Sequence, residues 1–366
     1  MAHPAQFEVQ WYDEHKNGID ILELIRPPSV SPEHVNRWIQ IAEDNNFKRL
    51  VLNSPVIRKI TCHNLQKLWL TGVDLDEEMF QTIVVSCPLI DWLKISNCAG
   101  LANLKVTKLQ KLKVFEVIFK GGGCVAVEAP SLEFFNYSKI YSFDNEERMP
   151  SQHCSLQMHS SQNLKHLQFE NIDITDEFFL DIKEKFPHLE DLNIHGCNHL
   201  RRIKISSHPI KRINLESNYR LEEAHIEVPS INRFKFRGCS IPLFSFTAPS
   251  GSCVSLIEFY WWDWQLPEAS WFAKLKDLLT KLSQSEILLQ LKCGSTLAST
   301  IVDEIRNSAL YPIPQVQTLS IPFEKGKFFD ADLILDAIFC TCRPKTIAQD
   351  WNQNLDLNSN ELSSIE

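Results

Sequence analysis

Apolar residues recur along this chain in the order apolar-x-x-apolar-x-apolar, with polar residues between them. The pattern is clearest in residues 64–106 and 163–205, which align without a gap and are identical at 13 of 43 positions. Cys98 of the first segment matches Cys197 of the second. The combined pattern L-x-x-L-x-L-x-x-C is that of a leucine-rich repeat. The sequence therefore predicts an α/β leucine-rich-repeat solenoid of the horseshoe type, with a parallel concave sheet and a convex side of mixed helix and strand.

The spacing between the strand cores predicts which strands share a sheet. The cores begin at Phe47, Leu65, Ile90, Leu101, Leu112, Leu132, Leu164, Leu189, Leu200, Ile210, Leu221, Ile231 and Leu256. Neighbouring parallel strands need a connection of about a dozen residues, which the shortest of these steps do not leave. We therefore expect the cores at Leu101, Leu200 and Leu221 to lie on the return side of a coil.

Other returns are predicted as helices, at residues 76–87 and 175–186, each of which ends before a proline. Thr175 is expected to cap the second helix. Residues 138–160 are polar and lengthen one coil, so we expect a projecting loop there.

The ends of the chain depart from the repeat pattern. Residues 35–347 are predicted to form the solenoid, preceded by a capping segment at 1–34 and followed by a polar tail at 348–366. Within the solenoid, residues 270–347 are expected to form less regular repeats. There, WFAKLKDLLTKLS and ADLILDAIF are predicted helices, and ILLQL and VQTLSI are predicted strands.

Composition narrows the functional classes. Within the 366 residues no apolar run approaches the roughly 20 needed to span a bilayer. The first residues also lack a signal-peptide stretch, so we expect a cytoplasmic or nuclear protein, or both. The eleven cysteines are scattered and odd in number, which indicates reduced thiols. A net charge of -9 disfavours nucleic-acid binding.

The phase of the pattern predicts a binding face. The third, fifth and seventh residues of each strand core should point outward across the concave sheet. Aromatic and arginine side chains dominate the energetics of protein interfaces. The predicted partner-binding residues are Trp69, Trp92, Phe134, His166, His195, Arg212, Arg233, Lys235, Arg237, Tyr260 and Trp262. The alternative is that the first three are covered by a loop or belong to the core.

Other candidate chemistry is weak. The run YWWDW at 260–264 offers a small-molecule pocket, although strand alternation assigns some of its rings to the core. Neither Cys62 with His63 nor Cys340 with Cys342 has the spacing of a zinc site, so we expect no metal and no cofactor.

Catalytic chemistry is not expected either. The glycines at 121–123 lack the lysine and the serine or threonine of a phosphate loop. His166 and His195 fall on neighbouring coils, but a polar repeat face brings such pairs together by chance. No catalytic motif occurs, and we expect no enzymatic activity.

Several segments resemble those of plant F-box/leucine-rich-repeat proteins. The first is VNRWIQIAEDNNFKRLVL at 35–52, in which Trp38 is the central tryptophan of a helix that leads into a strand. The others are CPLIDWLKISNC at 87–98, LKVFEV at 112–117, APSLEFFNY at 129–137 and CRPKTI at 342–347. Their order and spacing extend the resemblance over residues 35–347.

The resemblance implies that the repeats recruit a protein substrate to a cullin-type ubiquitin ligase, while an N-terminal F-box binds the ligase adaptor. Residues 1–34 do not show the F-box pattern, so the adaptor is an expected partner only if an F-box is encoded upstream of this chain. Two alternatives stay open. One is a free-standing repeat scaffold or competitor for the same partner, and the other is a hormone-like small-ligand sensor that uses the aromatic run.

Overall fold

A computed structural model of the chain describes most of the repeat region. The described residues are 8–12, 20–25, 32–53, 60–120, 123–140, 156–206, 209–247, 249, 251–261, 267–293, 297–307, 312–322 and 331–348. They fall into two compact units. Unit 1 comprises Met1–Asn193 and Cys197–His199, and unit 2 comprises Ile194–Gly196 and Leu200–Glu366, so the boundary lies within one strand, β12.

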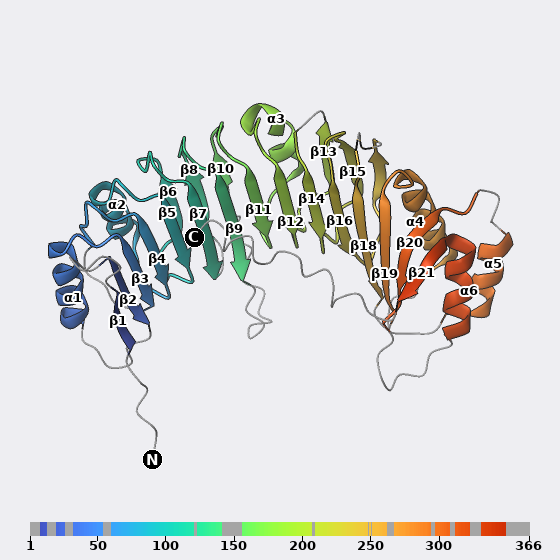
Figure 1. Ribbon diagram of the computed structural model, residues 1–366, viewed down its shortest axis with the longest axis horizontal. Helices are drawn as coiled ribbons and strands as arrows, with labels where there is room; N and C mark the ends of the chain where they lie inside the picture. The colour runs from blue at the N-terminus through green and yellow to red at the C-terminus, as the bar shows by residue number, and fades with distance from the viewer. Residues whose placement is uncertain are drawn as a thin grey trace, which may run out of the picture. The chain divides into compact units, whose positions relative to one another are not determined.

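Unit 1 contains a long sheet and a short one (Figure 1). In spatial order the long sheet has β1 (Glu8–Tyr12), β2 (Ile21–Ile25), β3 (Arg49–Asn53), β4 (Lys67–Thr71), β5 (Trp92–Ser96), β7 (Val114–Lys120), β9 (Phe134–Ile140), β11 (His166–Glu170) and β12 (Asp191–His195). The short sheet has β6 (Asn103–Val106), β8 (Cys124–Val127) and β10 (Leu156–Met158). β1 pairs with β2 in an antiparallel manner, whereas β2 pairs with β3 in a parallel one.

Unit 2 has the same two-sheet arrangement (Figure 1). In spatial order its long sheet has β14 (Arg212–Glu216), β16 (Arg233–Gly238), β18 (Val254–Trp261), β19 (Glu286–Cys293), β20 (Gln315–Ser320) and β21 (Arg343–Ala348). The short sheet has β13 (Arg202–Ser206), β15 (Glu223–Glu227) and β17 (Leu243–Phe246). The return strands therefore form a layer of their own, as the short spacings predict.

Helices make the remaining returns. Unit 1 has α1 (Pro32–Asp44), α2 (Glu77–Ser86), the short 3-10 helix η1 (Asp176–Phe179) and α3 (Ile182–Lys185). Unit 2 has α4 (Ala269–Lys281), α5 (Ser299–Asn307) and α6 (Ala331–Thr341), which contact one another. Asp76 caps α2 by accepting a hydrogen bond from the Met79 amide at 2.7 Å.

The core of each unit is built from the apolar positions of the repeat. Leu65, Leu68 and Leu70 are fully buried, as their first, fourth and sixth positions in the pattern require. In unit 2, Phe236 of β16 meets Phe244 of β17 edge to face, with ring centroids 5.2 Å apart. Side chains of the long and the short sheet therefore meet in one core, where their burial stabilises both layers.

A left-handed residue follows many strands of the long sheets. Positive φ occurs directly after β4, β5, β11, β12 and β14, at Gly72, Asn97, Asn171, Gly196 and Ser217. Glycine and asparagine adopt this conformation most readily, so they fit at the point where each coil turns away from the sheet. Nearby, the Asn218 side chain donates to the carbonyl of Ile194 at 2.9 Å. This bond lets a polar residue occupy a buried slot of the repeat.

Three details differ from the expectations. Residues 175–186 form η1 and α3 instead of one helix, and Thr175 makes no side-chain capping bond. The expected loop at 138–160 begins as the end of β9 and ends with β10, while residues 141–155 lie outside the described part. Leu256 is buried as expected, but it lies in register with Lys235 on the other face of the sheet and packs against Leu288 there, because β18 begins two residues earlier.

Candidate protein-binding face

The side of each long sheet opposite the core carries the predicted binding residues, and we call it the open face. In unit 1 the strand registers place Lys67, Trp92, Val114, Phe134 and His166 in one row. Trp69 lies in the next row, and its strand neighbours Leu68 and Leu70 point into the core. The phase deduced from the sequence is therefore the observed one in unit 1.

Two tryptophans form an aromatic cluster on this face. The rings of Trp69 and Trp92 are tilted by 60°, with centroids 5.5 Å apart. The guanidinium carbon of Arg49 lies 4.1 Å from the centroid of the Trp69 ring, and Lys67 Nζ lies 4.9 Å from that of Trp92. Such cation–π contacts stabilise both partners and order long basic side chains over the rings.

Trp92 is held from the side by Glu116 of β7. Trp92 Nε1 donates to Glu116 Oε1 at 3.2 Å, and Lys94 Nζ donates to Glu116 Oε2 at 3.1 Å. As a result Trp92 is only 6% exposed, although it lies on the open face. The expectation of an exposed Trp92 is wrong for this physical reason, whereas Trp69 and Phe134 remain partly exposed.

The predicted histidines lie on β11 and β12. His166 Nδ1 pairs with Asp191 Oδ2 at 2.5 Å, and the ring centroid of His166 is 6.1 Å from that of Phe134. His195 is half-buried near the end of β12. The His166–Asp191 pair gives this part of the face a polar group beside an aromatic one.

In unit 2 the open face carries a charged network centred on Glu216. Lys235 Nζ lies 2.9 Å from Glu216 Oε1, and Asn214 donates to the same oxygen at 2.6 Å. Arg237 lies 3.8 Å from the other oxygen. Burial alone raises the pKa of Glu216, but these neighbours outweigh burial and lower the pKa below its ordinary value.

Arg237 links this network to Tyr260. Its Nε lies 3.6 Å from Glu258 Oε2, and its guanidinium carbon lies 5.8 Å from the centroid of the Tyr260 ring. The Tyr260 hydroxyl donates to that of Tyr219 at 3.0 Å. Burial, with the Tyr219 bond adding to it, raises the pKa of Tyr260 to about 12. Tyr260 is therefore a neutral phenol at physiological pH.

The remaining predicted basic residues lie on the same face. Arg212 and Arg233 are in register on β14 and β16, and both are partly exposed. Trp262 lies outside the described residues. Tyr219, which is half exposed at 51%, was not among the predicted residues, because it belongs to the turn after β14 where the strand pattern gives no direction.

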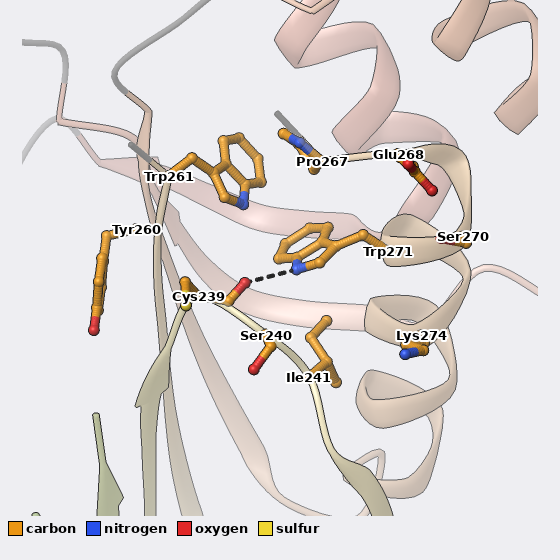
Figure 2. A pocket seen from close by; sticks show the side chains of 10 residues that line it. All are labelled: Cys239, Ser240, Ile241, Tyr260, Trp261, Pro267, Glu268, Ser270, Trp271 and Lys274. Atoms are coloured by element: carbon orange, nitrogen blue, oxygen red, sulfur yellow. Dashed lines mark hydrogen bonds between the residues drawn. The ribbon is translucent and has the colours of Figure 1, made fainter. Parts of the chain in front are cut away.

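The aromatic run is divided between the two faces of β18. Trp261 is 6% exposed and meets Trp271 of α4 edge to face at 5.0 Å, whereas Tyr260 points to the opposite side of the strand (Figure 2). The two indoles and their neighbours line a pocket of about 250 Å³. The Trp271 ring is held in place because its Nε1 donates a hydrogen bond to the Cys239 carbonyl at 3.1 Å. The expectation that alternation sends some of these rings inward is confirmed.

A larger cavity of about 570 Å³ lies among the three C-terminal helices. One face of α4 lines it, with Phe272 and Ala273, and Ile305 of α5 and Cys340 of α6 complete the apolar wall. Its volume falls within the range of small-molecule sites. This cavity was not predictable from the sequence, because the pattern of one helix does not show where its neighbours leave space.

Within the described residues, no three His, Cys, Asp or Glu side chains come together as metal ligands. None of the described helices is long and apolar enough to cross a membrane. The nine cysteines with described side chains are free thiols.

One part of the chain matches a known family of repeat domains. Residues 43–162 match the family model described as At1g61320/AtMIF1, LRR domain. None of the curated proteins searched matches the chain. The matched segment includes β4, β5, β7 and β9, whose open face holds the two tryptophans and Phe134. The chain therefore contains a leucine-rich-repeat domain, a type of domain that acts in protein–protein interaction.

Proposed function

We propose that this chain recognises a protein through the open face of its long sheets, as the substrate-recognition part of a ubiquitin-ligase receptor of the F-box/leucine-rich-repeat type. The observation that carries the proposal is the clustering of partly exposed aromatic and basic side chains on this face. Aromatic and arginine side chains are those that contribute most at protein interfaces.

The charge distribution supports recognition rather than a purely structural role. The chain as a whole carries a net charge of -9, yet β14, β16 and β18 present Arg212, Arg233, Lys235 and Arg237 against only Glu216 and Glu258 on the open face. A local positive potential of this kind speeds encounter with an acidic partner and disfavours basic ones.

The proposal is tested by reversing charge on the open face. A variant with Arg233, Lys235 and Arg237 replaced by Glu should capture less partner from the native extract, with the bound proteins identified by mass spectrometry. The matched control replaces Arg201, Arg202 and Lys204 by Glu, an equal change in charge at exposed positions before and within β13 of the short sheet. Equal capture by both variants, each with an intact thermal transition, rejects the open face as the binding surface.

The ligase role has its own test. An F-box encoded in frame upstream of Met1, or co-purification of the natural gene product with the cullin adaptor, supports a receptor. A natural product that binds the partner but never the adaptor supports the free-standing scaffold or competitor instead. The two readings share the open face and differ only in the adaptor.

A small-ligand sensor is a second candidate, favoured by the pocket that Tyr260, Trp261 and Trp271 help to line. A thermal-shift screen of plant hormones tests it, because a ligand that binds only the folded state raises the melting temperature. Trp271→Leu should abolish such a shift. A shift that survives this substitution places the ligand elsewhere.

A further inference from the structure

Two arginines and two tyrosines of unit 2 lie along β16 and beside it, on the open face. We call Arg233, Arg237, Tyr219 and Tyr260 the arginine–tyrosine patch. The Tyr260 side chain lies on the other side of β18 from that of Trp261 (Figure 2). Tyr219 reaches it through the hydrogen bond between the two hydroxyls, at 3.0 Å. The patch thus joins strands β16 and β18 to the turn after β14.

The two arginines retain hydrogen-bonding capacity. A guanidinium has five N–H donors, and strong bonds to carboxylates are about 2.7–2.9 Å long. Arg237 approaches Glu216 and Glu258 only to 3.8 and 3.6 Å, and its side chain is 40% exposed. Arg233 forms no ion pair with any residue in the described part of the chain. Both can accept an additional anion without breaking a short internal bond.

The phenols supply the apolar part of the patch. Tyr219 is 51% exposed, and its ring is oriented by the bond from Tyr260, whose hydroxyl also lies 3.4 Å from Ser217 Oγ. An aromatic ring that is fixed before binding loses little entropy when a partner covers it. An apolar side chain of a partner therefore has a defined surface to pack on, beside the two cations.

We propose that the arginine–tyrosine patch binds an extended acidic segment of the partner, with carboxylates on Arg233 and Arg237 and an apolar side chain on Tyr219. This rests on the proposed function and names the chemistry of the recognised segment. Arg233 and Arg237 are four residues apart on β16, about 13 Å at the rise of a strand. An extended peptide alongside β16 matches them with acidic residues at positions i and i+4.

Two internal carboxylates limit the positive charge of the patch. Glu216 and Glu258 lie within 4 Å of Arg237 and share its charge. Only a limited positive excess remains, which suits single charges spaced along a peptide.

The test is fluorescence anisotropy with the full chain and a labelled synthetic peptide that carries Glu at i and i+4 and Leu at i+6, because Tyr260 and Tyr219 lie beyond Arg237 along β16. Replacing both arginines, Arg233→Gln with Arg237→Gln, should weaken binding at least about tenfold, the effect of losing roughly 1.4 kcal/mol. This variant keeps the Lys235–Glu216 pair, and its thermal transition is measured beside that of the wild type to check folding. The control pair Arg202→Gln with Lys204→Gln on β13 should leave binding unchanged. Added salt should weaken binding to the wild type.

Several outcomes overturn the inference. One is that a peptide with Gln in place of Glu binds as tightly as the glutamate peptide. Another is that a phosphoserine version or a single-stranded oligonucleotide binds more tightly than the glutamate peptide. A third is that the control pair weakens binding as much as the arginine pair does. The inference is also overturned if the glutamate peptide does not bind while the Arg233/Lys235/Arg237→Glu variant loses partner capture. In that case the proposed function stands. Unchanged capture in that variant rejects the open face itself.

Discussion

Replacing Glu216 by Gln removes the carboxylate at the centre of the charged network in unit 2. The side chain is 13% exposed and interacts with Lys235 at 2.9 Å, with Asn214 at 2.6 Å and more weakly with Arg237. The amide oxygen of Gln still accepts one hydrogen bond, so the main loss is the charge-assisted part. Such bonds contribute about 1.5–3 kcal/mol, but Lys235 and Arg237 are partly solvated and recover some of it. We expect Glu216→Gln to lower the free energy of unfolding by about 1–2 kcal/mol at pH 7.

The effect should depend on pH with a defined sign. The pKa of Glu216 in the folded protein is lowered from the ordinary value of 4.5. Its carboxylate therefore stabilises the fold fully above that value, and the contribution is lost as pH falls through the lower folded-state pKa. Gln does not titrate. The difference between wild type and variant should be constant near neutral pH and shrink below pH 4.5.

Urea unfolding followed by circular dichroism, from acidic to neutral pH, measures this difference. The control is Glu222→Gln, which breaks the exposed pair with Arg201 and should cost at most about 0.5 kcal/mol. A Glu216→Gln penalty that grows as the solution is acidified, or one no larger than that of the control at pH 7, contradicts the assignment of Glu216 as a stabilising anion.

Three further predictions concern the frame that carries the open face. Gly100→Ala should lower the free energy of unfolding by about 1–3 kcal/mol. The reasons are that φ of Gly100 is +87° and that the added Cβ would lie 3.1 Å from the Leu75 carbonyl oxygen. The control is Gly251→Ala, whose Cβ would meet nothing within 4 Å and which should leave the melting temperature unchanged. Phe234→Ala should destabilise the fold by about 3–5 kcal/mol, since the ring is fully buried between β16 and β17. The control Leu243→Ala, at a 61% exposed position, should change stability by less than about 0.5 kcal/mol. Similar unfolding midpoints for the two variants would refute the assignment of Phe234 to the core. Burial raises the pKa of the Cys197 thiol to about 12, so iodoacetamide at pH 8 should alkylate it only after denaturation, and rapid labelling in the native protein, read by mass spectrometry, would show that the slot is open.

The repeat pattern was enough to predict the two-layer arrangement and the direction of most side chains. Period-two alternation assigns Leu68 and Leu70 to the core and Trp69 to the open face with no knowledge of neighbours. The steps of 10 or 11 residues likewise predicted β6, β13 and β15, because chain length forbids parallel neighbours so close in sequence. These features depend only on local periodicity and connection length.

Features that depend on neighbouring coils were not predictable. Trp92 is covered because Glu116, 24 residues later, accepts its N–H, and no pattern within β5 indicates that bond. The strands β2, β8 and β17 and the helix α5 were also missed, since each is a short segment whose pairing or packing, rather than its own sequence, makes it regular. Tyr219 joined the candidate site only through its contact with Tyr260, 41 residues away.

The central claim is that partners bind the open face, and site-specific photocrosslinking tests it most directly. Benzoylphenylalanine replaces Phe134 or Tyr260 on the open face and, as the control, Leu243, which is exposed on the short sheet. We predict that irradiation joins a captured protein to the first two positions and leaves the control uncrosslinked. Crosslinks from Leu243, with none from Phe134 or Tyr260, would contradict the account.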